Sequence, residues 1–224
     1  MLTLNRASLS RIIAILSTYV PSGIAYGTLA TAVHIPWYYT IALSVAVYSG
    51  AVQSAFVGLW TIGFEPVTLI VTAFLLNLRH TFYGPHLDEN YPGMSSTDMY
   101  SIAPFLTDEL YALSVSDPPM EVPEVKKLGY FAYACWFMSS TFGVAFAGGL
   151  PSFLYPILFL ALPALFLGLM VPRVKGRSTM ASATVSIAIA IFLKAYSFPE
   201  YSILISIVGG ILAGMLTLKA GGGK

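Results

Sequence analysis

Arg79 and His80 stand at the end of an apolar run that begins near Val67, so the sequence places a guanidinium and an imidazole beside hydrocarbon-like residues. A charge at the centre of a bilayer costs about 2.5–3.5 kcal/mol on insertion scales and therefore needs a reason. A guanidinium pairs with carboxylates, and an imidazole titrates near neutral pH. The pattern indicates a functional site, a structural ion pair or a position at the membrane surface.

Asp108 and Glu109 are a second costly feature, because two adjacent carboxylates interrupt the apolar run from Ser101 to Ser116. Opposite charges relieve part of each other's desolvation cost, so a structural ion pair with Arg79 is one interpretation. In the other, the same groups bind a zwitterion, with its carboxylate on Arg79 or on the amides of a broken helix end and its ammonium on an acidic side chain. Carboxylates and imidazoles can also carry protons, so Asp108, Glu109 and His80 are the predicted proton-coupling residues.

The first apolar run, from Arg11 to Val33, contains Pro21, Ser22 and Gly23 near its middle. A proline there frees a backbone carbonyl at membrane depth, which is tolerated only against protein or water. Gly23 and Gly27 also form a G-x-x-x-G pattern that allows close helix packing. The proline is then either a packing kink or the break of a discontinuous helix beside a substrate site, and we place the break in the site.

The second run, from Trp37 to about Trp60, holds Ser49 and Gln53 on one helical face. Such residues either bond to neighbouring helices or touch substrate. Asn77 shares a face with His80 in the third run. The predicted substrate-binding set is Arg79, Asp108, Glu109, Asn77, Gln53, Ser22 and Gly23.

Composition sets the class of protein that positions these residues. Of 224 residues, 57% are hydrophobic and only 9% are charged, whereas a soluble domain is about 25% charged. Several runs reach or approach the roughly 20 apolar residues that cross a bilayer as a helix. We predict an all-α polytopic membrane protein, one domain over residues 1–224, with about 7–8 transmembrane helices of which some are short or broken by proline.

The sequence lacks the residue patterns that several other classes of function require. Cys135 is the only cysteine, so no disulfide and no cysteine-based metal site is available. His80 and His86 are six apart, and no Ser/His or HExxH arrangement occurs, which argues against an enzyme. A net charge of +1 without a basic tract argues against nucleic acid. We expect no cofactor and no metal, and the scattered prolines and single polar residues favour a transporter over a channel.

The basic residues predict the topology. We expect the third run, Gly63 to Gly84, to stop at Pro85, and residues 86–98 to form a loop or a surface helix. Residues 101–116 are short for a crossing, so they form either a short span or a re-entrant half-helix. If they cross, eight runs span the membrane, and nine basic residues lie on the same side as both termini. The positive-inside rule makes this side cytoplasmic. The nine residues are Arg6, Arg11, Lys126, Lys127, Arg173, Lys175, Arg177, Lys219 and Lys224. We therefore favour the crossing, and Lys194 is expected to extend toward the interface.

Five segments resemble the AzlC-like branched-chain amino-acid permeases, in the order and at the spacing of that family. They are Pro21–Gly27, Tyr48–Gln53, Leu76–His80 with Tyr83-Gly84, Leu106–Glu109 and Ala161–Phe166. Each is weak alone, and together they are specific and cover nearly the whole chain.

The resemblance implies the large subunit of an exporter of valine, leucine, isoleucine or methionine across a prokaryotic cytoplasmic membrane, coupled to an ion or proton gradient. It also implies a small membrane partner of the AzlD type. Two alternatives stay open. One is a permease for a different small solute, and the other is a membrane scaffold whose conduction path is shared with its partner.

Overall fold

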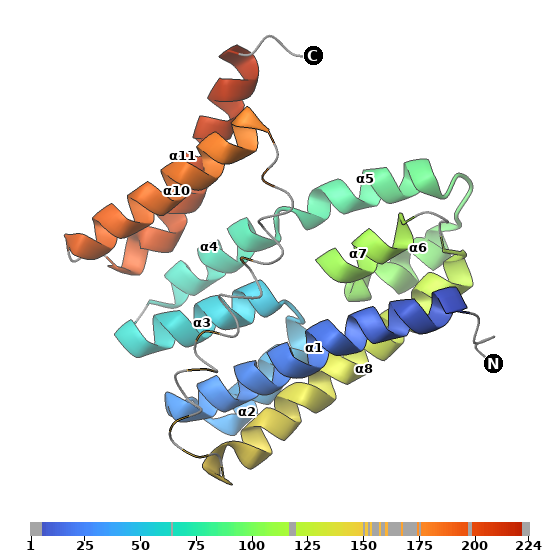
Figure 1. The fold of residues 1–224 in the computed structure, drawn as a ribbon, viewed down its shortest axis with the longest axis horizontal. Coiled ribbons are helices and arrows are strands. Elements are labelled where there is room, and N and C mark those ends of the chain that lie inside the picture. Colours follow the sequence, from blue (N-terminus) through green and yellow to red (C-terminus); the bar gives the residue numbers. More distant parts are fainter. Residues whose placement is uncertain are drawn as a thin grey trace. The chain divides into compact units, whose positions relative to one another are not determined.

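The computed structural model describes residues 6–63, 65–116, 120–149, 176–196 and 199–220, with isolated positions at 151, 153, 157, 160, 167 and 174. Within those residues the structure is helical and contains no strand (Figure 1). This confirms the predicted all-α fold class. The proline of the sixth run, in Ala161-Leu162-Pro163-Ala164, lies outside the described residues.

The chain forms two compact units. The first comprises Met1–Ser54 and Asn77–Leu162, and the second comprises Ala55–Leu76 and Pro163–Lys224. One boundary falls inside a helix and another at the end of a helix, next to Asn77. All the predicted substrate-binding residues belong to the first unit.

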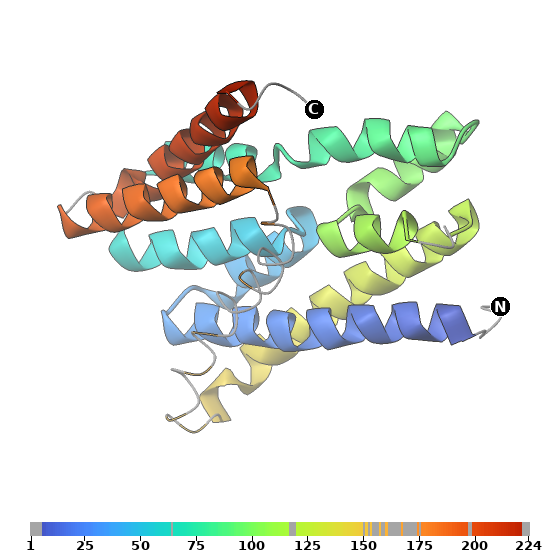
Figure 2. The same ribbon diagram turned by 45° about the horizontal axis from the view of Figure 1, so that its top comes forward.

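The first unit is built on two long helices, α1 (Arg6–Ala32) and α8 (Val122–Phe146), which pack against each other (Figures 1 and 2). Their backbones approach closely at two glycines. A Cβ atom added at Gly27 would lie 2.1 Å from the Ser140 carbonyl oxygen, and one added at Gly143 would lie 2.3 Å from the Ile24 carbonyl oxygen. Small residues at such a crossing let helices meet without side chains between them.

Helix α1 runs unbroken through Pro21, so the predicted break at Pro21–Gly27 is wrong. Pro21 is exposed, whereas Ser22, Gly23 and Gly27 are buried. A proline inside a helix costs about 3 kcal/mol, but α1 packs against α8 on both sides of it, through the Tyr19 ring on Trp136 before the proline and through Gly23 and Gly27 after it. The G-x-x-x-G pattern therefore determines the local structure, and the proline does not.

The break occurs in the second run instead. Helix α2 (Trp37–Ala46) ends and α3 (Gly50–Ile62) begins on either side of Tyr48, whose φ is 45°. The Gln53 side-chain amide donates to the Ser44 hydroxyl over 3.0 Å, although these positions would be about 13.5 Å apart along a straight helix. The chain therefore bends sharply at Tyr48, and the run predicted as one span from Trp37 to about Trp60 is two helices rather than one continuous helix.

The third run is also two helices, α4 (Pro66–Asn77) and α5 (His80–Asn90), with a turn at Leu78 and Arg79. Helix α5 continues past Pro85, so the predicted stop at this proline is wrong. The polar stretch that follows is partly helical, because α5 extends to Asn90 and α6 (Ser96–Ile102) begins soon after.

Residues 101–116 do not cross the membrane as one helix. They contain the end of α6, the 3-10 turn η1 (Ala103–Phe105) and α7 (Asp108–Ser114), which has 7 residues and is about 10 Å long against a hydrocarbon thickness of about 30 Å. Tyr91, at the end of α5, donates to the Ser114 carbonyl over 2.7 Å. Asp98 forms an ion pair with Lys126 at the start of α8. The segment therefore turns back toward the end of α5, a path that fits the re-entrant alternative better than the favoured crossing.

In the second unit, α10 (Arg177–Ala195) and α11 (Pro199–Ala220) form a hairpin held by small residues. Ser178 and Ser186 donate to the carbonyls of Gly214 and Ser206, each over 2.9 Å. By length and composition, α1, the segment Val122–Gly149 and α10 could each span a membrane, and Gly50–Ile62 and Ile205–Ala220 are shorter apolar helices. Lys194 lies in the last turn of α10, where its predicted extension to the interface stays a prediction.

Candidate functional site

The structure pairs Arg79 with Asp108. Arg79 lies in the turn before α5, and Asp108 opens α7, where the Thr107 hydroxyl accepts the Leu110 amide over 3.3 Å and caps the helix. The Arg79 Nη1 lies 2.6 Å from Asp108 Oδ2, and the Tyr83 hydroxyl donates to Oδ1 over 2.5 Å. The carboxylate is therefore held by one cation and one phenol at the first turn of a helix, where the helix dipole also favours negative charge.

The two partners differ in exposure. The Asp108 side chain is 11% exposed, whereas the Arg79 side chain is 37% exposed. The Arg79 Nε is nevertheless buried and has no hydrogen-bond partner in the part of the chain that the structure describes. A buried donor without an acceptor costs about 1–3 kcal/mol. The guanidinium thus retains one directed donor that Asp108 does not satisfy.

Glu109 has a different partner from its neighbour. The Tyr19 hydroxyl lies 3.2 Å from Glu109 Oε2 and 2.5 Å from the Thr107 hydroxyl. The two carboxylates that are adjacent in sequence therefore face different surroundings, one ionic and one phenolic. Of the two, Asp108 is the one that the structure places on Arg79.

Asn77 joins the two helix breaks. Its side-chain oxygen accepts the Ser49 hydroxyl over 3.0 Å, and its carbonyl lies 3.1 Å from His80 Nδ1. Ser49 belongs to the break after α2, and Asn77 precedes the turn that carries Arg79. Two interruptions that are far apart in sequence are thus tied side by side in the first unit.

Gln53 is fully buried, and both ends of its amide are occupied. Its nitrogen donates to Ser44, and its oxygen accepts the Trp136 indole N–H, each over 3.0 Å. Ser44 bonds in turn to Ser140 over 3.0 Å. This network links α2, α3 and α8 and holds the bend at Tyr48. Of the two interpretations of Gln53, the structure therefore shows hydrogen bonding to neighbouring helices.

Ser22 and Gly23 lie on the surface that α1 presents to α8. The Ser22 hydroxyl donates to the Thr18 carbonyl over 2.6 Å within the same helix. A Cβ atom at Gly23 would lie 2.7 Å from the Ser139 Cβ. The structure therefore places these two residues in helix packing rather than at a helix end, and does not bring them to a break.

The comparisons with known proteins fit this description. Residues 14–150, which include Arg79, Asp108 and both breaks, match the family described as AzlC protein. The chain belongs to the AzlC family. It is 26% identical over 211 residues to an uncharacterized membrane protein of Helicobacter pylori, covering 92% of both chains. It is 22% identical to the inner membrane protein YgaZ of Escherichia coli, covering 91% of this chain and 84% of the relative.

One relative of this AzlC-family chain has a name that states a transport role. It is the branched-chain amino acid transport protein AzlC of Bacillus subtilis, 23% identical over 140 residues, which are 62% of this chain and 54% of that protein. No solved structure matches the chain. The relatives and the apolar helices together identify an AzlC-family membrane protein related to amino-acid transport.

Sequence reasoning missed several residues of the site in this AzlC-family chain. Tyr83 stands four residues after Arg79, and Tyr111 stands three after Asp108, so helical spacing could have placed both tyrosines beside the charged pair. Tyr48 gave no such signal. Its hydroxyl is buried without a hydrogen-bond partner among the described residues, and its ring packs edge-on against Tyr133 with centroids 4.9 Å apart.

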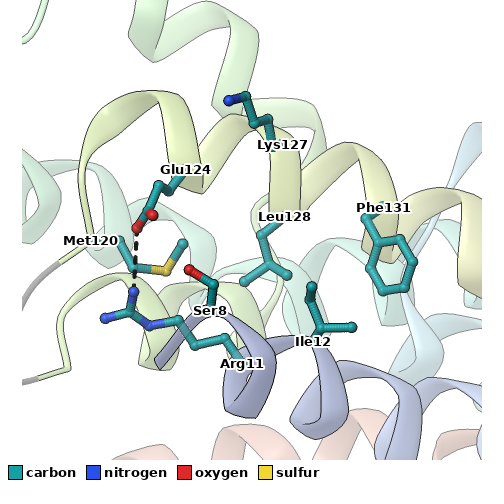
Figure 3. Close-up of a pocket in the computed structure, with 8 residues that line it drawn as sticks. All are labelled: Ser8, Arg11, Ile12, Met120, Glu124, Lys127, Leu128 and Phe131. Atoms are coloured by element: carbon teal, nitrogen blue, oxygen red, sulfur yellow. Dashed lines mark hydrogen bonds and ion pairs between the residues drawn. The ribbon is translucent and has the colours of Figure 1, made fainter. Parts of the chain in front are cut away.

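A small cavity of about 100 Å³ lies where α1 and α8 begin (Figure 3). The Arg11 guanidinium crosses it toward Glu124, with 3.3 Å between Nη1 and Oε2, and Lys127 is also on its lining. Arg11, near the start of α1, and Lys127, near the start of α8, therefore lie at the same end of the first unit. Nearby, hydrogen bonds from Lys126 and Ser95 hold the pKa of Asp98 below its ordinary value.

A metal is the other kind of ligand that carboxylates and imidazoles hold. In residues 6–63, 65–116, 120–149 and the described parts of the second unit, no group of three His, Cys, Asp or Glu side chains lies close enough to bind one. Asp108 instead has an arginine and a tyrosine as partners. A carboxylate held by a guanidinium and a phenol is an arrangement that can bind charged groups.

Proposed function

We propose that this chain is the large subunit of a secondary transporter that exports branched-chain and similar apolar amino acids, such as methionine, across the cytoplasmic membrane. It would act with a small membrane subunit of the AzlD type and use an ion or proton gradient. The family and the name of the Bacillus subtilis relative support this proposal. The observation that carries it is the Arg79–Asp108 pair at a helix break.

An amino acid can replace this pair charge for charge. Its carboxylate would take the Arg79 guanidinium, including the buried Nε–H that Asp108 leaves without an acceptor, because arginine binds carboxylates through two parallel N–H donors. Its ammonium would then be held by Asp108, or by Glu109 on the next residue. Since opposite charges remain paired throughout, the exchange avoids an isolated charge in a low dielectric.

The break at Tyr48 supports binding at the same place. Helix α3 begins there with backbone N–H groups that have no partner within the helix, and Ser49 is bonded to Asn77 two residues before Arg79. Discontinuous helices in transporters present such ends to substrates and ions. Gln53 would contribute indirectly in this proposal, by holding the bend.

Export of labelled amino acid tests the proposal. Cells loaded with labelled valine, leucine or methionine would express the chain alone, the chain with a candidate small membrane subunit, and that pair with Arg79→Ala. Arg11→Ala is the matched control, because it also removes an arginine that pairs with a carboxylate. We expect export that needs the partner and falls at least about tenfold in Arg79→Ala, more than 1.4 kcal/mol, but not in Arg11→Ala.

The outcomes separate the alternatives. Folded protein that exports none of the three amino acids favours a permease for another solute, and export by the partner without this chain favours the scaffold role. The double variant Arg79→Asp/Asp108→Arg separates substrate binding from a structural ion pair. If the pair is only structural, the swap restores both thermal stability and export, whereas a binding site regains stability without export.

A further inference from the structure

Helices α5 and α7 are joined by a ladder of four side chains beyond the Arg79 contact. On α5, Tyr83 and His86 are three residues apart, and on α7, Asp108 and Tyr111 are three apart, so each pair shares a helical face. Tyr83 bonds to Asp108, and Tyr111 bonds to His86 Nδ1. Between these bonds the two tyrosine rings stack with centroids 4.2 Å apart and planes 9° from parallel.

The ladder connects solvent with a buried carboxylate. His86 is exposed and Tyr111 is partly buried, whereas Asp108 is 9% exposed. His86 lies toward the end of α5, where Tyr91 meets Ser114. The path from His86 to Asp108 therefore begins at the surface and leads inward to the helix break.

We propose that His86 is the residue through which protons pass between water and Asp108, by way of Tyr111 and Tyr83. Protonation of Asp108 then releases Arg79 for the substrate carboxylate, while Glu109 holds the substrate ammonium. This inference rests on the proposed function, because it assigns the proton path of that transporter. His86 was not among the predicted proton-coupling residues, and the family comparison gives it no role.

The proton balance for release to water is simple. Protonated Asp108 gives its proton to the Tyr83 oxygen, and the Tyr83 hydroxyl proton passes to the Tyr111 oxygen through a bridging water. The Tyr111 hydroxyl proton moves to His86 Nδ1, and the proton on His86 Nε2 leaves to water. Asp108 ends ionised and paired with Arg79, as in the structure, and His86 ends neutral. Uptake is the reverse.

The charged and titratable groups around the ladder are consistent with protonation of Asp108 controlling its ion pair with Arg79. The Arg79 Nη1 lies 2.6 Å from Asp108 Oδ2, so a proton on Asp108 removes one of the two charges of this ion pair. The His80 ring meets the Tyr83 ring edge-on with centroids 5.3 Å apart, and its Nδ1 is bonded to the Asn77 carbonyl. Glu109 is bonded to Tyr19 rather than to the ladder. At the solvent end of the ladder, His86 contacts Tyr111 of α7. The exposed residues Asp88 and Glu89 follow His86 on α5.

His86→Asn is the informative variant, because asparagine keeps an acceptor oxygen where Nδ1 stood but does not titrate. His34→Asn is the matched control, since His34 lies outside the ladder and has a φ of 60°, which asparagine tolerates. Vesicles that contain the chain and its partner would be assayed for pH-driven accumulation of labelled leucine and for leucine exchange at equal pH.

We expect His86→Asn to lose at least about tenfold in pH-driven accumulation, within the range that positioned proton-transfer groups contribute, while its exchange matches that of His34→Asn. Tyr111→Phe should behave in the same way. Unchanged accumulation in His86→Asn overturns the proposal. Equal loss of accumulation and exchange also overturns it, because His86 would then support the fold or the binding site rather than the proton path.

A second readout does not need transport. After a drop in external pH, infrared difference spectroscopy follows the C=O band of protonated carboxylic acids, and the part of this band that Asp108→Asn removes belongs to Asp108. We expect the band to rise at least about tenfold more slowly in His86→Asn than in His34→Asn. If the wild-type protein moves no amino acid but shows this difference, the proposed substrate fails and the proton path stands. Equal rates in the two variants remove the path.

Discussion

Helix α1 and the α2–α3 segment are alike in length, yet the one with a proline is continuous and the one without is broken. Helix α1 contains Pro21 and spans Arg6–Ala32 without interruption. The α2–α3 segment has no proline and bends at Tyr48, a tyrosine in the left-handed region, where a residue other than glycine costs about 1–2 kcal/mol.

The difference shows that tertiary contacts decide where a helix breaks in this protein. Helix α1 is held straight by close backbone contact at Gly27 and Gly143. The bend at Tyr48 is held by buried hydrogen bonds that Gln53 makes to Ser44 and Trp136. Local propensity predicts the opposite pattern, because proline is the strongest helix breaker.

The largest effect is expected from Gly27→Leu, which removes the close contact that keeps α1 straight. The added side chain would meet backbone atoms of α8 that cannot move aside, first the Ser140 carbonyl oxygen. We expect a loss of at least about 3 kcal/mol, at the upper end of overpacking effects, measured as a lower unfolding midpoint and a smaller folded fraction in detergent. Gly84→Leu is the control, since a Cβ there meets nothing within 4 Å. Equal stability of the two variants would show that the glycine contact is not needed.

A smaller effect is expected when the hydrogen bonds that Gln53 makes at the bend are removed. Gln53→Leu leaves the Trp136 indole N–H and the Ser44 hydroxyl without their present partner, which should cost about 2 kcal/mol. In a double-mutant cycle with Trp136→Phe, the coupling energy should be about 1–2 kcal/mol. Additive losses would mean that the indole–amide bond does not hold the bend.

Pro21→Ala should act in the stabilising direction. It restores an N–H donor inside α1 at an exposed position, so we expect a gain of about 1–2 kcal/mol, less than the full cost of an interior proline. Export should remain at the wild-type rate. A more stable variant with lost export would give Pro21 a role in movement and would weaken the contrast between the two segments.

The smallest effect concerns Asp98, whose ion pair with Lys126 anchors α6 to the start of α8. Hydrogen bonds from Lys126 and Ser95 lower the pKa of Asp98 in the folded state. The ionised side chain therefore stabilises the folded protein at pH values above its unfolded-state pKa of about 3.9. This stabilisation is lost as the pH falls through the folded-state pKa. Wild-type protein should be slightly more stable than Asp98→Asn at neutral pH, with the two unfolding midpoints converging in acid. Parallel midpoints across this range would contradict the ion pair, and high salt should also narrow the gap.

The sequence by itself determined the class of this protein and the residues with chemistry. Burial of apolar surface depends on composition and run length, so an all-helical membrane protein was readable, and the cost of charge in hydrocarbon singled out Arg79, Asp108 and Glu109. The capped start of α7 was also present in sequence, as Thr107 followed by two acidic residues.

Only the tertiary structure decided which runs break, which segment turns back, and which polar residues meet. The bend at Tyr48 and the return of α7 depend on contacts between positions far apart in sequence, such as Gln53 with Trp136 and Tyr91 with Ser114. Helical periodicity records which residues share a face, but not which face another helix covers. The ladder from His86 to Asp108 therefore appears only once α5 and α7 lie together, because each helix supplies half of every bond in it.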